Sequence, residues 1–211
     1  MPSRPPSLEG DYYYPADRAP QGPHAIWPTL RPLLPAPPCR VLEIGCGDGS
    51  LAAELVRLGH AVVGFDVSES GIAVAKKQVP DASFLRMSIY EQLPTDWRGR
   101  FDVVVSLETI EHLYLPGVLL QRSHEALLPD GMILLSTPYH GYLKNLALAV
   151  SGKFDPHFSV LWDYGHIKFF SKRTLTELLR RTGFEDIRFV GYGRVRWLWK
   201  SMIAVARKGP G

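Results

Sequence analysis

The chain has 211 residues, 45% of them hydrophobic and 21% charged, which is typical of one globular domain with a sizeable core. Its formal net charge of +3 tolerates an anionic ligand or a nucleic acid but requires neither. Cys39 and Cys46 are too few for a disulfide framework, and their spacing matches no zinc pattern. No apolar segment resembles a signal peptide or is long enough to cross a bilayer, so we expect a cytoplasmic protein without a membrane span. The composition predicts no particular oligomeric state.

Residues 1–38 are rich in proline and aromatic side chains. Proline lacks a backbone donor and restricts the residue before it, so we expect no long helix or strand before Arg40. Only HAIWPTLRPLL, residues 24–34, is predicted as a short helix. Because disordered segments are normally poor in aromatic residues, we predict an arm that folds over a site rather than a free tail.

Strands and helices alternate after this arm. Strands are expected at 39–45, 60–66, 82–88, 101–108 and 131–138, and helices at 50–59, 69–78 and 116–131. This alternation predicts βαβ units and a parallel sheet with both faces covered, in a domain that covers residues 39–211.

The alternation is interrupted at residues 139–165, which hold aromatic side chains and histidines but no clear strand. Insertions of this kind commonly form substrate-binding walls. A helix is then predicted at 171–184, with Ser171 as its N-cap and Gly183 at its end. The final segments, 185–193 and 198–208, are predicted to form an antiparallel hairpin at one sheet edge.

A glycine-rich loop, VLEIGCGDGS, connects the first strand to the first helix of this region. Gly45, Gly47 and Gly49 permit a tight turn where a ligand approaches the backbone beside a helix N-terminus. Their spacing differs from the G-x-G-x-x-G dinucleotide fingerprint. Glu43, under the loop, would repel a pyrophosphate but could receive an ammonium group. Asp66 ends the second strand, where a carboxylate can accept hydrogen bonds from both ribose hydroxyls of an adenosine.

On LEIGCGDGS and Asp66, residues 40–208 resemble the class I S-adenosylmethionine-dependent methyltransferases. The resemblance implies an α/β, doubly wound, Rossmann-like fold with seven mostly parallel strands and an antiparallel strand at the edge. It also implies SN2 transfer of a methyl group from S-adenosylmethionine to a nucleophile, with the enzyme aligning the reactants and removing the acceptor proton.

The resemblance also implies a set of cofactor contacts. Where the family usually has an aspartate near the adenine amine, this chain has Ser88, whose hydroxyl can still accept a hydrogen bond. Met87 and Ile89 are expected to flank the adenine ring. The full expected set is Glu43, Gly45, Cys46, Gly47, Gly49, Asp66, Val67, Met87, Ser88, Ile89 and Leu107.

The stretch SLETIEHLYLP follows the fourth strand, at the carboxyl edge of the sheet, where ligands of open α/β sheets bind. In a helical turn Glu108, Glu111 and His112 would share one face. One interpretation is a divalent metal site for Mg²⁺, Mn²⁺ or a similar ion, which would lower the pKa of an acceptor hydroxyl. The E-x-x-E-H pattern resembles that of the ubiquinone-biosynthesis O-methyltransferases, which are associated with magnesium. It also resembles the small-RNA 3′-end 2′-O-methyltransferases, in which a distant histidine, here His166, completes the site.

Two other interpretations of this stretch stay open. His112 could be a metal-free general base oriented by a glutamate, for which Glu111 is the candidate. Alternatively, one glutamate caps the short helical turn and the histidine packs under the N-terminal arm.

The aromatic residues of the two irregular segments suit a planar acceptor such as a phenol or catechol. The candidate substrate residues are Tyr14, Trp27, Tyr139, His140, Tyr142 and Trp162. We therefore expect O-methylation of a hydroxylated small molecule in quinone or secondary metabolism.

Two alternative functions also fit parts of the sequence. The segment GYGRVRWLWK interleaves Arg194, Arg196 and Lys200 with aromatic residues, a pattern found in single-strand binders, which favours methylation of RNA 3′ ends. The segment also alternates like a strand, however, and a net charge of +3 makes a nucleic acid the less favoured partner. The other alternative is a non-catalytic module that binds the cofactor; the intact glycine loop and Asp66 argue against it.

Overall fold

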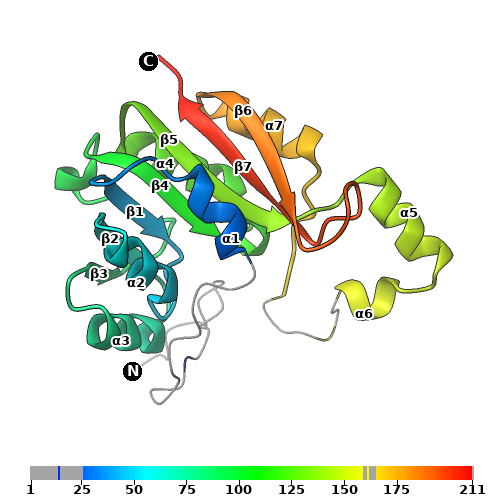
Figure 1. Cartoon of the computed structure of the whole chain (residues 1–211), viewed down its shortest axis with the longest axis horizontal. Helices are drawn as coiled ribbons and strands as arrows, with labels where there is room; N and C mark the ends of the chain where they lie inside the picture. Colours follow the sequence, from blue (N-terminus) through cyan, green and yellow to red (C-terminus); the bar gives the residue numbers. More distant parts are fainter. Residues whose placement is uncertain (1–13, 15–25, 159–160, 162–164, 211) are drawn as a thin grey trace, which may run out of the picture.

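The computed structural model describes Tyr14 and residues 26–158, 161 and 165–210. Its centre is a twisted seven-stranded sheet in the order β3-β2-β1-β4-β5-β7-β6 (Figure 1). The strands are β1 Arg40–Ile44, β2 Ala61–Asp66, β3 Ser83–Arg86, β4 Phe101–Leu107, β5 Leu127–Pro138, β6 Phe184–Tyr192 and β7 Ser201–Lys208. The neighbours among β1 to β5 are parallel, and β7 is antiparallel to both β5 and β6. The predicted fold is confirmed, and the antiparallel final strand lies one place in from the edge strand β6.

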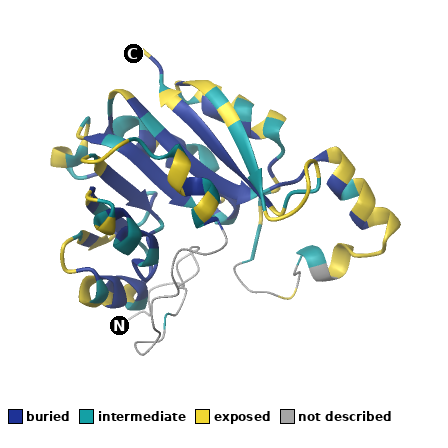
Figure 2. Ribbon diagram, in the orientation of Figure 1, coloured by how far each residue is buried: buried dark blue, intermediate teal, exposed yellow. Residues whose placement is uncertain are grey.

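Helices cover both faces of the sheet. The α-helices are α1 Trp27–Leu30, α2 Ser50–Arg57, α3 Glu69–Gln78, α4 Pro116–Ala126, α5 Tyr142–Val150, α6 Phe154–Phe158 and α7 Lys172–Arg181, and the 3₁₀ turns are η1 Arg31–Leu33, η2 Thr95–Trp97 and η3 Ile110–His112. Because successive side chains of a strand point to opposite faces, Val41 and Leu42 belong to different apolar clusters. Residues of α4 and α7 pack in one cluster and residues of α1, α2 and α3 in the other. The strands between these helices are largely buried (Figure 2).

Local sequence signals explain several helix ends. The Ser68 hydroxyl accepts a hydrogen bond from the Gly71 N–H at 3.0 Å and caps α3. Ser171 caps α7 in a reciprocal arrangement with Thr174, as predicted. Gly183 has a φ of 86°, a left-handed conformation typical of a helix stop.

The boundary between α4 and β5 differs from the prediction. The helix was expected to reach residue 131, but it ends at Ala126, and Leu127 already pairs with Phe101 of β4. Pro129 lacks a backbone donor and disfavours helix at the residue before it, which prevents a longer helix. The strand pairing therefore begins earlier than the local apolar pattern indicated.

The predicted short helix near the N-terminus is present as α1 followed by η1. Ile26 is 3% and Leu30 0% exposed, so this part of the predicted arm packs against the sheet. Residues 1–13 and 15–25, on which most of the arm prediction rests, lie outside the described residues.

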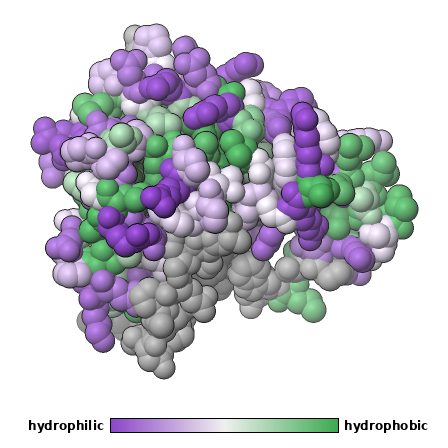
Figure 3. Space-filling model, in the orientation of Figure 1, coloured by the Kyte–Doolittle hydropathy of each residue, from purple (hydrophilic) through white to green (hydrophobic). Residues whose placement is uncertain are grey.

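The predicted insertion contains α5 and α6, which project beyond the end of β5 (Figure 1). Much of their surface is exposed (Figure 2), and apolar side chains gather on the visible side of this projection (Figure 3). None of the helices that the structure describes combines the length and apolar character needed to span a bilayer.

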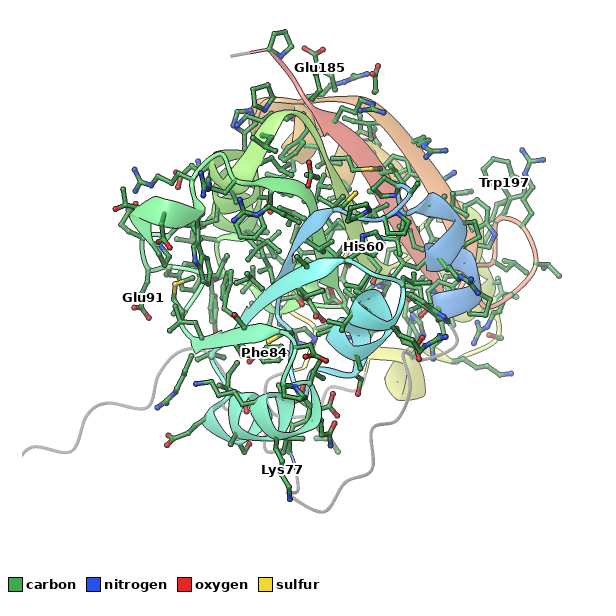
Figure 4. All side chains as sticks on the ribbon, turned by 60° about the vertical axis from the view of Figure 1, so that its left-hand side comes forward. His60, Lys77, Phe84, Glu91, Glu185 and Trp197 are labelled. Carbon is green, nitrogen blue, oxygen red and sulfur yellow. The ribbon has the colours of Figure 1, made fainter. Side chains whose placement is uncertain are left out.

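Residues 193–200 connect β6 to β7 and form no strand, contrary to the alternation seen in the sequence. Trp197 on this connection extends outward from the body of the molecule, and it is 45% exposed (Figure 4).

Candidate active site

The loop between β1 and α2 turns at three glycines. Gly45, Gly47 and Gly49 have φ values of 77°, 52° and 79°, in the left-handed region that glycine enters without a steric penalty. A Cβ atom on Gly45 would clash with the Thr109 side chain, and one on Gly47 would lie 2.6 Å from the Tyr14 hydroxyl oxygen. Because these glycines lack Cβ atoms, other groups can lie directly against the backbone of this loop, as a loop that holds a ligand requires.

Asp66, at the end of β2, holds the loop from one side. Its Oδ2 accepts a hydrogen bond from the Gly47 N–H at 2.9 Å, and its Oδ1 accepts one from the Ser68 N–H at 2.8 Å. A carboxylate oxygen can accept more than one donor, so both oxygens can also receive ribose hydroxyls. The structure thus brings Asp66 to the glycine loop, as the sequence predicted.

Two further carboxylates lie at this loop. Glu43 is 4% exposed, and its Oε2 has no hydrogen-bond partner within the described residues. Burial, and then the nearby charges of Asp66 and Asp48, raise the pKa of Glu43 well above its usual value. Asp48, which sequence reasoning missed, accepts hydrogen bonds from the N–H and hydroxyl of Ser50 at 3.1 and 2.6 Å. This acidic surrounding suits a ligand with cationic groups, such as the ammonium and sulfonium of S-adenosylmethionine, and disfavours a pyrophosphate.

Tyr14 lies over the glycine loop and is not among the residues that line the cavity at Lys144 and His166. Its N–H donates to the Ser70 hydroxyl at 2.9 Å, and its ring and hydroxyl lie against Gly47 and Gly71. The sequence had assigned Tyr14 to the substrate wall. Its position favours a role at the cofactor loop.

The residues expected around the adenine follow β3. Met87 and Ile89 are each 6% exposed and belong to the core, so little of either side chain is available to flank a ring. The Ser88 N–H donates to Glu91 at 2.9 Å, while its hydroxyl accepts from the Tyr90 N–H at 3.1 Å. A lone pair of this hydroxyl can still accept from an adenine amine.

The sequence predicted a cofactor contact for Cys46, but its side chain is buried and only its backbone can make such a contact. It is 4% exposed, and its side chain packs against Gly64 of β2, which leaves only its backbone at the loop. Burial raises the pKa of this thiol well above its usual value, so it is not a reactive thiolate. Val67 and Leu107 are half-buried at the ends of β2 and β4, and their cofactor contacts stay predictions.

An acid–imidazole cluster lies at η3, after β4. Ligand atoms of Glu111, His112 and His166 all lie within 4.8 Å of one another. The rings of His112 and His166 meet edge to face with centroids 4.9 Å apart, and His166 Nε2 is 4.0 Å from Glu111 Oε1. The Glu111 carbonyl accepts hydrogen bonds from the N–H groups of Ile167 and Lys168 at 2.9 and 3.0 Å, which fixes the distant segment beside η3.

Glu111 is fully buried, and neither of its carboxylate oxygens has a hydrogen-bond partner in the described part of the chain. Burial, and then the charge of Glu108, raise the pKa of Glu111 well above its usual value. Burial, followed by His112, lowers the pKa of His166 to about 4, so this imidazole is neutral at pH 7 and can act as a ligand. A buried carboxylate beside two imidazoles fits a divalent cation.

Glu108 does not join this cluster, although the sequence predicted it as a fourth metal ligand. Its carboxylate accepts hydrogen bonds from the hydroxyls of Ser136 and Ser201 at 2.8 and 3.2 Å. Its φ is 48°, and it precedes η3, which begins only at Ile110. The helical face assumed for Glu108, Glu111 and His112 therefore does not form.

A cavity of about 180 Å³ opens beside the cluster. It is lined by Glu108, Pro138, His140, Lys144, His157, Phe158, His166, Phe169, Arg194, Lys200 and Ser201. His166 belongs to both the cavity and the cluster. His140 stacks on Phe158 at 5.8 Å and meets Phe169 edge to face at 5.0 Å, so the wall is aromatic, as expected of a site for a planar ring.

Of the five candidate substrate residues that the structure describes, His140 alone lines this cavity. Tyr139 is 6% exposed and packs in the core against Trp199, and Trp27 packs on the opposite apolar cluster. Tyr142 is 79% exposed, and Trp162 lies outside the described residues. The lining residues Phe158, Phe169 and Lys144 were missed because nothing in the local sequence separates them from ordinary packing or surface residues.

The glycine loop, Asp66 and the order of the strands together define an S-adenosylmethionine-dependent methyltransferase. The family described as "Methyltransferase domain" matches residues 17–188, and the chain belongs to it.

Among curated proteins, the ubiquinone biosynthesis O-methyltransferase of Azorhizobium caulinodans is 33% identical over 180 residues, covering 81% of this chain and 69% of the relative. The protein of the same name from Bradyrhizobium diazoefficiens is 43% identical over 117 residues, covering 54% of this chain and 45% of the relative. The chain therefore matches only part of the length of these relatives.

Solved structures agree with the fold. An S-adenosylmethionine-dependent methyltransferase from Mesorhizobium loti aligns with a TM-score of 0.66 at 21% identity, covering 87% of this chain and 97% of that one. A 1,6-didemethyltoxoflavin-N1-methyltransferase from Burkholderia thailandensis, solved with S-adenosylhomocysteine, aligns with a TM-score of 0.62 at 20% identity, covering 88% and 75%. At these identities the likeness shows the fold alone, and the acceptor has to be argued from the site.

Proposed function

We propose that this methyltransferase is O-directed and acts on a hydroxylated aromatic small molecule of the phenol or catechol type. The observation that carries the proposal is that an acid–imidazole cluster, Glu111, His112 and His166, borders a cavity with aromatic walls. A hydroxyl acceptor has to lose its proton, and the cluster supplies groups suited to that task. The curated relatives are ubiquinone biosynthesis O-methyltransferases, which supports the same type of acceptor.

The residues at the glycine loop fit S-adenosylmethionine, which supplies the electrophilic methyl group when it is bound. Asp66 would accept hydrogen bonds from the ribose hydroxyls of the cofactor, and Glu43 would compensate the positive charge of the cofactor's ammonium group. Gly47 has no Cβ, so the Tyr14 ring lies directly against the backbone of this loop. The chain's contribution is therefore to orient the cofactor and the acceptor for in-line transfer.

Two routes for removing the acceptor proton stay open. In one, Glu111, His112 and His166 hold a divalent cation, which would lower the pKa of an acceptor hydroxyl. One carboxylate with two imidazoles favours Mn²⁺ or another first-row transition ion over Mg²⁺, which prefers oxygen ligands. In the other route, His112 takes the proton without a metal, and the Glu111 carboxylate orients it.

Methylation of RNA 3′ ends is the alternative that the position of the basic residues disfavours. Arg194 and Lys200 line the cavity, and Arg196 lies over the Trp197 ring at 4.9 Å. These cations do not form the continuous row of outward-facing positive charges that is expected of a groove following a nucleic-acid backbone.

Purified protein incubated with S-adenosylmethionine carrying a labelled methyl group tests the proposal. The panel consists of catechols, phenols, their O-methylated counterparts and short RNAs with free 3′ ends, with Asp66→Ala as the variant that lacks cofactor binding. We expect label on the oxygen of hydroxylated aromatics and none on their O-methylated counterparts. Label on RNA alone would favour the alternative, and cofactor binding without label on any acceptor would favour a non-catalytic module.

A further inference from the structure

The cavity collects positive charge. Lys144, Arg194 and Lys200 line it, while Glu108 is the single carboxylate among the described residues that line it. None of the three cations forms an ion pair with a carboxylate within the residues that the structure describes. Glu108 itself is held by two serine hydroxyls.

Lys144 is the most informative of the three, because it is only 2% exposed. Its Nζ donates hydrogen bonds to the carbonyl oxygens of Tyr139 at 2.7 Å and Lys200 at 3.4 Å. An ammonium has three protons, so one donor is left for the cavity that Lys144 lines. A buried ammonium that lacks a carboxylate partner carries a desolvation cost, which an anionic ligand would offset.

The one carboxylate among the described lining residues, Glu108, attracts Lys144 but forms no ion pair with it. Burial, with Arg194 adding to it, lowers the pKa of Lys144 to about 8, so this amine is still largely protonated at neutral pH. Burial, and then Lys144, lower the pKa of His140 to about 4, which makes this wall residue a neutral ring. Among the described residues, the cavity therefore combines neutral aromatic walls with three cations and one carboxylate, an excess of positive charge.

We propose that the acceptor carries an anionic oxygen group, a carboxylate or a phosphate ester, on its aromatic ring. This inference rests on the proposed function and deepens it. Lys144 and Arg194 receive the anion, and Phe158 and Phe169 flank the ring. The acceptor hydroxyl faces His166, the lining residue that also belongs to the acid–imidazole cluster. A cavity of about 180 Å³ is smaller than the ~300–1,000 Å³ typical of drug-sized ligands, so it suits a single ring with small substituents.

The proposal also explains the basic connection between β6 and β7. Arg194 lines the cavity, whereas Arg196, two residues later, lies over the exposed Trp197 ring. The two arginines share one loop and differ in what they face, so Arg196→Gln is a matched control for Arg194→Gln.

Calorimetry in the presence of S-adenosylhomocysteine measures acceptor binding without requiring turnover. The probes are 3,4-dihydroxybenzoate, its methyl ester and 2-hydroxyphenyl phosphate. We expect an anionic probe to bind about tenfold or more tightly than the ester, the equivalent of one charge-assisted hydrogen bond. Arg194→Gln should remove this preference and leave ester binding unchanged, and Arg196→Gln should preserve it. Because Arg194 is exposed, its replacement is not expected to prevent folding, which circular dichroism would check.

Each outcome of this experiment either supports or contradicts the proposed anion site. A preference for the benzoate identifies the anion as a carboxylate, and a preference for the phosphate ester identifies it as a phosphate. Equal binding of acid and ester, or no binding of either anion, overturns the inference. If the ester is nevertheless methylated, the proposed function stands without it. Tight acid binding that depends on Arg194 but gives no methylation of any acceptor supports the anion site and contradicts the proposed function.

Discussion

His112 and His166 come from distant parts of the chain, yet their imidazole rings meet edge to face with centroids 4.9 Å apart. Backbone hydrogen bonds hold the two segments side by side, because the Glu111 carbonyl accepts from the N–H groups of the two residues after His166. The buried Glu111 carboxylate completes the cluster without a hydrogen-bond partner among the described residues. Burial disfavours the charged form of this carboxylate and raises its pKa, and a bound cation would stabilise that charged form.

Chelation should therefore suppress methyl transfer. Exhaustive EDTA treatment is expected to remove turnover, and Mn²⁺ should restore it at lower concentration than Mg²⁺, because two of the three ligands are imidazoles. Glu111→Gln should imitate EDTA, with Glu177→Gln on the exposed surface of α7 as the control. Initial rates and cofactor binding are measured for each protein, and cofactor binding should survive both treatments.

Full activity after chelation would contradict the metal route. In that case the same cluster predicts that His112→Ala lowers kcat by about 10²–10⁴-fold, the usual contribution of a general base. A His112→Ala enzyme with normal kcat would contradict the base route as well and leave the cluster a structural role.

Asp66→Ala should weaken S-adenosylmethionine binding strongly. The change removes a charged acceptor for ribose hydroxyls, worth about 1.5–3 kcal/mol per hydrogen bond, and it also releases the Gly47 and Ser68 N–H groups. Calorimetry measures the affinity, and Asp81→Ala, an exposed aspartate near the end of α3, is the control. Unchanged affinity in a folded Asp66→Ala protein would remove Asp66 from the site.

Tyr14→Ala should weaken cofactor binding by about 1–2 kcal/mol and leave the acceptor KM unchanged at saturating cofactor, because the ring lies against Gly47 and not in the acceptor cavity. Tyr142→Ala, at a residue that is 79% exposed, should change neither quantity. Tighter cofactor binding in Tyr14→Ala would mean that the ring occupies the ligand's place, and a raised acceptor KM alone would restore the substrate-wall interpretation.

The sheet and the glycine loop could be predicted because their signals are local. Buried strands read as apolar runs, and left-handed turns select glycine, so neither needs tertiary information. The beginning of β5 was missed because the pairing of Leu127 with Phe101 is a long-range event that outweighs helical propensity. Glu108 was misplaced for a related reason: the spacing argument assumes a helix, while its φ of 48° takes it out of that face.

The acceptor cavity was the least predictable part of the site. An excess of aromatic residues does not distinguish a wall from a core: Tyr139 belongs to one core cluster, and Trp27 packs against the other. Lys144 looks like a surface residue of an amphipathic helix in the sequence, and only the fold reveals that it is buried beside two carbonyl oxygens. His166 was identified in advance only through a family pattern, because nothing in its neighbourhood indicates a partner.

The free energy of unfolding should decrease as the pH falls from about 6.5 to about 4. In this range His140 stays neutral in the folded chain but is protonated in the unfolded chain. Burial lowers the pKa of His140 from 6.5 to about 4, so between these values the unfolded chain binds a proton that the folded chain does not. The free energy of unfolding therefore decreases from pH 6.5 downward and levels off below pH 4, by up to about 3 kcal/mol for this group. His140→Phe keeps a ring that can pack against Phe158 and Phe169 but has no titrating group. Urea unfolding at several pH values should show a shallower acid-side loss in this variant. Parallel losses in the two proteins would mean that His140 is protonated in the folded state at an ordinary pKa.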